Sequence, residues 1–148
     1  MGTQQILMII LSVIVVGAAV AVGIQMFDTQ ADNQTRNALV VESMQMAVQA
    51  QAWYRTPSMM GGGGYKVTNI DIDRIATYIN NNANGPTIEL DGIGTFTITR
   101  LGGAASDSLL IRAVDTPAPG TKIAVETNVR LGGRGKEGVT VNPNATTP

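Results

Sequence analysis

The sequence predicts an α+β fold in which one long N-terminal α-helix packs on a small antiparallel β-sheet. Three observations support this prediction. The chain opens with an apolar stretch, residues 6–24, in which Ser12 is the only polar side chain. Helix-favouring residues then continue to Thr56 without a proline or a glycine. From Thr87 the pattern changes to short β-rich runs separated by glycine and proline, which is typical of antiparallel strands joined by turns.

The apolar stretch is long enough to cross a membrane as a helix. A helix over residues 6–24 would be about 30 Å long, which matches the hydrocarbon core of a bilayer. No charged side chain occurs before Asp28. We therefore expect residues 1–27 to form an apolar helix that is able to lie in a membrane. The residues expected to form its contacts are Ile6, Leu7, Ile10, Leu11, Ile14, Val15, Val22 and Phe27.

A cleaved secretory signal peptide is the alternative interpretation of this stretch. Small residues at Gly17–Ala19 or Ala19–Ala21 could form the cleavage site. A signal peptide begins with a basic segment, however, and residues 1–5 contain no basic side chain. The apolar run is also longer than the hydrophobic region of a typical signal, so we favour an uncleaved helix.

Residues 28–56 are predicted to continue the same helix as an amphipathic segment with two apolar stripes. A helix that lies on one domain needs one apolar face, so a second stripe suggests a second partner, such as a neighbouring copy of the chain. Burial of both stripes in one larger core is the alternative, but about ninety residues remain after Pro57, which is few for that purpose. At 100° per residue, one stripe contains Leu39, Met46, Ala50 and Trp53, and the nearly opposite one contains Val41, Met44, Val48 and Ala52.

Residues 57–148 are predicted to form one globular head that contains a short helix and a sheet. Gly61–Gly64 is interpreted as a flexible linker, because the Lys-Ser/Thr pair of a phosphate-binding loop does not follow it. Residues 70–79 place isoleucines at helical spacing, with Asn69 or Asp71 as the candidate N-cap residue.

Five strands are expected over residues 87–90, 93–101, 109–114, 122–131 and 139–141. Asp91 and Gly92 predict a two-residue hairpin turn between the first two strands. The polar tail, Asn142–Pro148, is expected at the surface. Along the fourth strand, every second residue points to the same face of the sheet, and this face is expected to lie on the long helix. This face consists of Ile123, Val125, Thr127 and Val129.

The composition argues against catalysis and nucleic-acid binding as main roles. The chain has no histidine and no cysteine, so it lacks the commonest general base, a common metal ligand and any thiol nucleophile. Ten Lys and Arg residues against eleven Asp and Glu residues indicate no strongly basic surface for a phosphate backbone. We predict no enzymatic activity, no catalytic residue, no cofactor, no metal site and no nucleic-acid partner.

Three weaker motifs leave alternatives open. Gly132–Gly138 carries two basic residues and could bind an anion, although an exposed turn is the simpler interpretation. Carboxylates such as Asp107 and Asp115 could contribute to a calcium site. Asn33-Gln34-Thr35 and Asn144-Ala145-Thr146 match the acceptor pattern for N-glycosylation, and the second lies in the more accessible tail.

The order of apolar helix, loop and sheet resembles the type IV pilin superfamily, which includes the pseudopilins of secretion systems. The resemblance rests on an apolar stretch close to the N-terminus, on the small residues Gly17, Ala18 and Gly23 inside it, and on the order of the elements. It implies a pilin-like fold. The apolar half of the helix would first anchor the subunit in the inner membrane and then pack in a filament core.

One residue departs from the family pattern. The acidic residue at the fifth mature position of pilins corresponds to Gln5 here, if Met1 is the first mature residue. In the family that carboxylate is thought to neutralise the terminal amine of the adjacent subunit. A neutral amide can only hydrogen-bond to the amine, so the resemblance implies that docking through Met1 and Gln5 is weaker or achieved differently.

We therefore expect a structural subunit of an extracellular, type IV pilus-like filament at the cell surface. Its expected partners are identical subunits, the inner membrane before assembly, and an export and assembly machinery. Gly17 and Gly23 are expected sites of local unwinding or close helix packing. The alternative is a single-pass membrane-anchored protein whose small extracytoplasmic domain binds a ligand or partner. In the filament interpretation, packing of the helix on the head or on other subunits is expected at Leu39, Val41, Met44, Met46, Val48 and Trp53.

Overall fold

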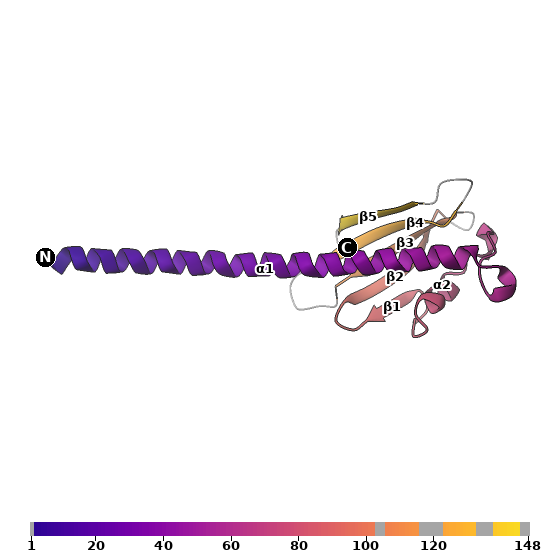
Figure 1. Ribbon diagram of the computed structural model, residues 1–148, viewed down its shortest axis with the longest axis horizontal. Helices are drawn as coiled ribbons and strands as arrows, with labels where there is room; N and C mark the ends of the chain where they lie inside the picture. The colour runs from indigo at the N-terminus through magenta and orange to yellow at the C-terminus, as the bar shows by residue number, and fades with distance from the viewer. Residues whose placement is uncertain (1, 103–105, 116–122, 133–137, 146–148) are drawn as a thin grey trace. The chain divides into compact units, whose positions relative to one another are not determined.

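The computed structural model describes residues 2–102, 106–115, 123–132 and 138–145. It confirms the predicted α+β class, in which a long N-terminal helix packs on a five-stranded antiparallel sheet (Figure 1). The helices and strands are α1 (Gly2–Arg55), α2 (Ile72–Ile79), β1 (Thr87–Leu90), β2 (Gly94–Leu101), β3 (Ser108–Val114), β4 (Ala124–Arg130) and β5 (Gly138–Ala145). Two short 3₁₀ turns, Ser58–Met60 and Val67–Asn69, lie between α1 and α2.

The chain forms two compact units, Met1–Gln34 and Thr35–Pro148. The first unit contains the N-terminal part of α1, and the second contains the rest of α1, α2 and the sheet. The predicted boundary after residue 27 follows the change in composition. The observed division lies further along the helix, close to Leu39, which is the first buried residue of α1.

The five strands form a simple antiparallel meander in the order β1-β2-β3-β4-β5. This order leaves β1 and β5 at the two edges of the described sheet. In β2, β3 and most of β4, buried and more exposed residues alternate, as a sheet with one covered face requires.

The turn between β1 and β2 contains three residues, 91–93, and not the predicted two, because Leu90 pairs with Gly94. Gly92 has a φ of 79°, which a glycine adopts readily. Gly94 has a φ of 153°, and a Cβ placed there would lie 2.5 Å from the carbonyl oxygen of Val114. A side chain at residue 94 would therefore collide with β3.

The last strand is longer than the sequence predicts. We expected a strand over residues 139–141 and a surface tail after it, but β5 extends from Gly138 to Ala145 and includes Pro143. Proline is tolerated here because β5 is an edge strand and its register against β4 shifts between Ala124 and Glu126. Residues 142–144 are exposed, and residues 146–148 lie outside the described part of the chain.

Helix α2 begins where the sequence predicts. Asp71 is its N-cap residue, and its side chain accepts a hydrogen bond from the backbone N–H of Asp73 at 3.1 Å. Asn69, the other candidate cap, belongs to the preceding 3₁₀ turn. Ile75 and Ala76 are fully buried, so this helix contributes one apolar face to the core.

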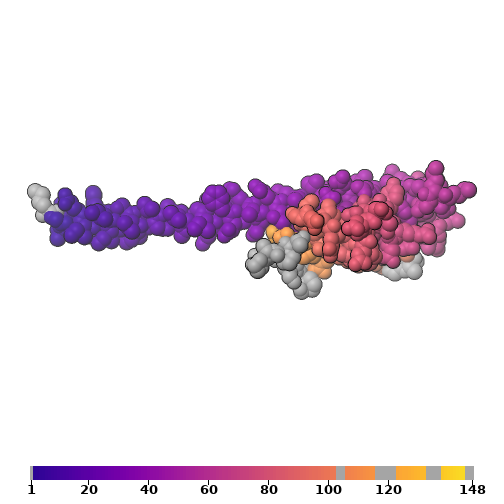
Figure 2. Space-filling view, turned by 90° about the horizontal axis from the view of Figure 1, so that it is seen from below, coloured from indigo at the N-terminus to yellow at the C-terminus, as the bar shows by residue number. Residues whose placement is uncertain are grey.

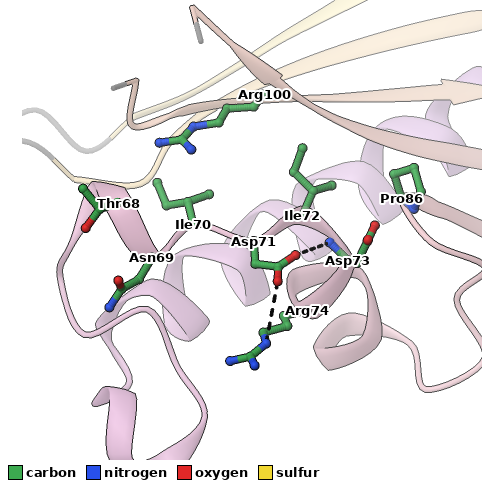
Figure 3. A pocket seen from close by; sticks show the side chains of 9 residues that line it. All are labelled: Thr68, Asn69, Ile70, Asp71, Ile72, Asp73, Arg74, Pro86 and Arg100. Carbon is green, nitrogen blue, oxygen red and sulfur yellow. Dashed lines mark hydrogen bonds and ion pairs between the residues drawn. The ribbon is translucent and has the colours of Figure 1, made fainter. Parts of the chain in front are cut away.

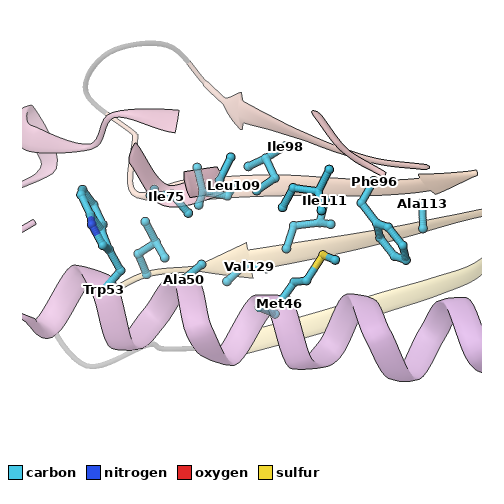
Figure 4. Close-up of a cluster of buried hydrophobic side chains, with 14 of the residues drawn as sticks. Met46, Ala50, Trp53, Ile75, Phe96, Ile98, Leu109, Ile111, Ala113 and Val129 are labelled. Atoms are coloured by element: carbon cyan, nitrogen blue, oxygen red, sulfur yellow. The ribbon is translucent and has the colours of Figure 1, made fainter. Parts of the chain in front are cut away.

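The core of the second unit lies between the inner face of α1 and one face of the sheet. Figure 4 shows Met46, Ala50 and Trp53 of α1 on the side of the helix that faces sheet residues such as Leu109 and Val129. Burial of one large apolar side chain contributes about 1.5–3 kcal/mol, so the large apolar side chains of this face contribute several kcal/mol to the stability of the unit. As predicted, one face of the fourth strand is buried, at Ile123, Val125, Thr127 and Val129.

One buried polar contact joins α1 to β4. Ser43 and Thr127 are both fully buried, and their hydroxyl oxygens lie 2.8 Å apart. The Ser43 hydroxyl also donates to the carbonyl oxygen of Val40 at 2.9 Å. Because each hydroxyl has one proton, Thr127 is then the donor to Ser43. The pair fixes how α1 lies along the sheet.

Replacing Ser43 is therefore predicted to destabilise the head more than replacing Thr127. Ser43→Ala leaves the Thr127 hydroxyl buried without a partner, which costs about 1–3 kcal/mol. Thr127→Val removes the donor and leaves the Ser43–Val40 hydrogen bond intact, so it should lower the free energy of unfolding less. The double variant, Ser43→Ala with Thr127→Val, should recover most of the stability that Ser43→Ala loses. Urea unfolding of a fragment that starts at residue 28 measures these differences. Equal losses of unfolding free energy in the two single variants would contradict the assignment of Thr127 as the donor to Ser43.

Candidate functional site

The first unit exposes nearly all of its apolar side chains. The eight predicted contact residues are between 53% exposed, for Ile10, and 74% exposed, for Phe27. In Figure 2 they belong to the indigo and violet surface at the start of the chain. Among the described residues, α1 is the one helix long and apolar enough to cross a membrane, and its most apolar window is not buried in the protein.

The polar groups of residues 2–27 are compatible with an apolar environment. Ser12 donates its hydroxyl to the carbonyl oxygens of Met8 and Ile9, at 3.0 Å and 2.9 Å, so it is satisfied within the helix. Gln5 is exposed in the first turns of α1, and Met1 lies outside the described residues. The described surface from residue 2 to residue 27 is therefore uncharged and fit to lie against lipid or other apolar helices.

The helix is continuous through Gly17 and Gly23, without local unwinding. A Cβ at either position would meet no atom within 4 Å, so neither glycine is required by packing inside the chain. Gly17 lies in a shallow hollow of about 390 Å³ together with Ser12, Val13 and Val16. The sequence did not predict this hollow, although Val13 and Gly17, and likewise Ser12 and Val16, are four positions apart and lie on one side of the helix. The hollow allows another helix to approach closely.

The two predicted stripes of the amphipathic segment have different environments. Leu39, Met46 and Trp53 are at most 2% exposed and lie in the core. Val41, Met44 and Val48 of the opposite stripe are 63%, 46% and 61% exposed. The second unit thus covers only the first stripe.

The outer face of α1 in the second unit also lacks charge. Over residues 37–52, Glu42 is the only charged residue, and it is half-buried. Surface helices usually carry charged side chains on the face that water covers. An uncharged face over about four turns is typical of a surface that another molecule covers. The exposed residues of this outer face are Asn37, Ala38, Val41, Met44, Gln45, Val48 and Ala52.

The glycine run after α1 is a hydrogen-bonded turn and not the flexible linker that we predicted. Gly63 donates its N–H to the carbonyl oxygen of Trp53 at 3.1 Å, and Gly64 donates to that of Thr56 at 2.9 Å. A Cβ on Gly62 would lie 2.3 Å from the carbonyl oxygen of Thr56. Glycine is needed here because the loop packs directly against the last turn of α1.

Tyr54 holds the end of this loop. Its hydroxyl lies 3.0 Å from the carbonyl oxygens of both Tyr65 and Gly132, and its one proton is shared between them. The two tyrosine rings form an edge-on pair with centroids 5.8 Å apart. Burial, and to a lesser degree the negative charge of Asp107, raises the pKa of Tyr54 above its ordinary value.

A polar depression of about 660 Å³ lies beside the start of α2 (Figure 3). Three of its four charged side chains have structural partners in the chain. Arg100 donates to the carbonyl oxygens of Val67 and Ser106, at 2.8 Å and 2.9 Å, and Asp71 caps α2 and lies 3.7 Å from Arg74. The depression therefore offers a polar surface in which most charged groups are held by contacts within the chain.

The weaker sequence motifs gain no support as metal or anion sites. In the described residues, no three acidic side chains gather as metal ligands would, and this includes Asp107 and Asp115. Most of the Gly132–Gly138 segment, residues 133–137, lies outside the described part of the chain.

No protein-family model, curated protein or solved structure matches this chain. The function is therefore inferred from the residues and their geometry, and the surface that stands out is apolar and uncharged.

Substitutions in the two stripes of α1 are predicted to differ in their effect on the stability of the head. Val48→Glu should change the free energy of unfolding of the head by no more than about 0.5 kcal/mol, because the side chain is exposed. Leu39→Ala should cost about 2–5 kcal/mol, because it opens a cavity between α1 and the sheet. Chemical unfolding of the fragment from residue 28 compares the two. A large loss of unfolding free energy in Val48→Glu would mean that the outer stripe is part of the core.

Alkaline pH is predicted to destabilise the head through Tyr54. Below pH 10 this tyrosine is protonated in both the folded and the unfolded chain, and its buried neutral form is fully accommodated. Above about pH 10 the unfolded chain ionises first, because the pKa is raised in the folded state, so stability falls as pH increases. Tyr54→Phe should make this decline shallower between pH 9 and pH 12. Identical slopes in urea unfolding would contradict the assignment.

Proposed function

We propose that this chain is a structural subunit of an extracellular, type IV pilus-like filament, assembled by packing of its apolar N-terminal helices. The single observation that carries the proposal is an apolar unit that is uncovered in its own chain and precedes a folded head. The element order supports the pilin resemblance.

The apolar unit must be covered by lipid or by other apolar surfaces both before and after assembly. It carries more than a dozen large apolar side chains that are exposed in the single chain. Moving such a helix from lipid into water would cost on the order of tens of kcal/mol at about 1.5–3 kcal/mol for each large side chain. Extraction from a membrane must therefore be coupled to burial against other apolar surfaces, and identical helices supply them.

The outer stripe distinguishes a filament from a simple anchor. A single-pass anchor explains the apolar surface up to Phe27 but requires nothing of the helix after Asp28 and Asp32, where charge reappears. The uncharged face over residues 37–52 lies beyond these acids. Contacts between copies that continue along α1 account for this face.

The alternative is a membrane-anchored protein whose head binds a ligand or partner. The observation that favours it is the polar depression beside α2, which has room for a small molecule. Asp71 caps α2 and Arg100 holds loops together, so we rank this function second.

Electron microscopy of cell-surface material separates the two functions. In the filament function, wild-type chains form filaments, and Val48→Glu reduces their number strongly because it would bury an unpaired charge between copies. Deletion of residues 1–27 should abolish assembly and leave a soluble, folded head. Thr99→Glu is the matched control, since Thr99 is exposed on the sheet face opposite α1 and should leave filaments intact.

A different pattern would favour the anchor. If wild-type chains occur only as dispersed membrane monomers, and if Val48→Glu behaves like wild type in every assay, the filament proposal is wrong. Circular dichroism of each variant shows that its head is folded.

A further inference from the structure

The loop after α1 exposes large apolar side chains. Met59 and Met60 are 99% and 79% exposed, and Tyr65 is 64% exposed. We call residues 57–66 the tip loop, because they lie beyond the last turn of α1, at the end of the second unit where α2 also lies (Figure 1). Apolar side chains that gather on one exposed segment are typical of a surface that another molecule covers.

The backbone of the tip loop is fixed by internal hydrogen bonds. Met60 donates its N–H to the carbonyl oxygen of Pro57 at 2.9 Å, and Gly61 donates to that of Ser58 at 3.1 Å. A Cβ on Gly64 would lie 3.3 Å from the backbone nitrogen of Ser58, so the two ends of the loop pack against each other. The backbone that carries the two methionines is therefore in place before a partner binds, which lowers the entropic cost of binding.

A mainly apolar hollow of about 380 Å³ lies beside the tip loop. It is lined by Trp53, Gly61, Arg74, Thr77 and Tyr78. Trp53 is buried, whereas Tyr78 is 54% exposed, so one aromatic ring is covered and the other is open to a partner. The hollow has room for a large apolar side chain, and an aromatic one would gain favourable contacts with these rings.

The charge beside this hollow is positive. The sequence contains no acidic residue between Glu42 and Asp71. Lys66 is exposed, and in the described part of the chain it takes part in no ion pair. A complementary partner would therefore carry a large apolar side chain next to carboxylates.

A segment with this complementary pattern lies in α1. Phe27 is 74% exposed and is followed by Asp28, and Asp32 lies one turn further on. Residues four positions apart share a helix face, so the two carboxylates lie on the same side. Arg36 is the next residue of this series, but its guanidinium donates to the carbonyl oxygen of Pro143 at 2.6 Å. Among the described residues, neither acid forms an ion pair.

We infer that the tip loop of one copy docks on residues 27–32 of a second copy. Phe27 enters the hollow beside the methionines, and the carboxylates of Asp28 and Asp32 lie next to the Lys66 amine. The inference rests on the proposed function, since a filament supplies the second copy. The contact joins two different surfaces of the chain, so it repeats from copy to copy and can build an open helical array. The charge pairs would fix the register of this contact.

An anionic lipid surface fits the tip loop less well. Such a surface attracts clusters of several basic side chains, whereas Lys66 is the only basic residue of the tip loop. Asp71 and Asp73 are exposed on or beside α2, which also lines the hollow, and anionic lipid would repel them. A single helix segment covers a smaller area than a bilayer and can avoid these acids.

Charge reversal in the full-length chain, with filaments counted by electron microscopy, tests the contact. Lys66→Glu should reduce the number of filaments by about tenfold or more, because like charges then meet in the contact. Asp28→Lys combined with Asp32→Lys should act in the same way. A chain with all three substitutions should recover filaments, because its charges are complementary again. Glu89→Lys is the matched control, since Glu89 is an exposed acid on β1, outside the contact.

Cross-linking keeps the test independent of membrane insertion, which new basic residues after the apolar stretch can disturb. The chain has no cysteine, so Ala31→Cys and Met60→Cys together introduce its only two thiols. Ala31 lies one turn after Phe27, and Met60 precedes Gly61 of the hollow. A bifunctional maleimide should link assembled chains into a ladder of dimers, trimers and longer species. Each single-cysteine variant should give dimers at most.

Filaments that give no ladder, or whose number is unchanged in Lys66→Glu, would overturn the docking contact and leave the proposed function intact. Filaments that bind vesicles of phosphatidylglycerol, and lose this binding in Lys66→Glu without losing assembly, would assign the tip loop to lipid instead. A ladder obtained from membranes that hold no filaments would support the contact and contradict the proposed function.

Discussion

The packing of α1 against the sheet is the interaction on which the rest of the structure depends. The inner face of the helix supplies Leu39, Met46 and Trp53 to a core that is otherwise made of strand residues and α2. The buried bond between Ser43 and Thr127 sets the position of the helix along the sheet. Without this packing, five short strands would have one apolar face open to water, and a sheet of that kind is not stable alone.

The same packing determines which surfaces remain open. A helix can present one face to a sheet, so the stripe that contains Val41, Met44 and Val48 is left exposed when the opposite stripe is buried. The residues before Thr35 belong to a separate unit whose apolar side chains are exposed in the single chain. The surface of residues 2–27 and the exposed stripe lack the charged side chains that keep soluble monomers apart, and this favours a function in which they are covered by lipid or by other copies.

Local patterns in the sequence predict the elements well because their causes are local. The periodicity of α1, the Asp71 cap of α2 and the alternation in the fourth strand depend on neighbouring residues, and all are observed. The need for glycine at residue 94 could not be predicted, because it comes from the nearby backbone of Val114, which is distant in sequence. The same holds for the length of β5, in which Pro143 is tolerated because β5 is an edge strand with a shift of register against β4. For the candidate site, the apolar residues and both stripes can be predicted from the sequence. The hollow around Gly17 and the exposure of one stripe are seen only in the three-dimensional structure.

A helical reconstruction of the natural assembly tests the central claim most directly, because it shows what covers the N-terminal helices. The account predicts that each helix contacts equivalent helices of neighbouring copies along residues 6–27, and that the heads face outward. A map in which every N-terminal helix lies alone, surrounded by lipid and touching no equivalent helix, would contradict it.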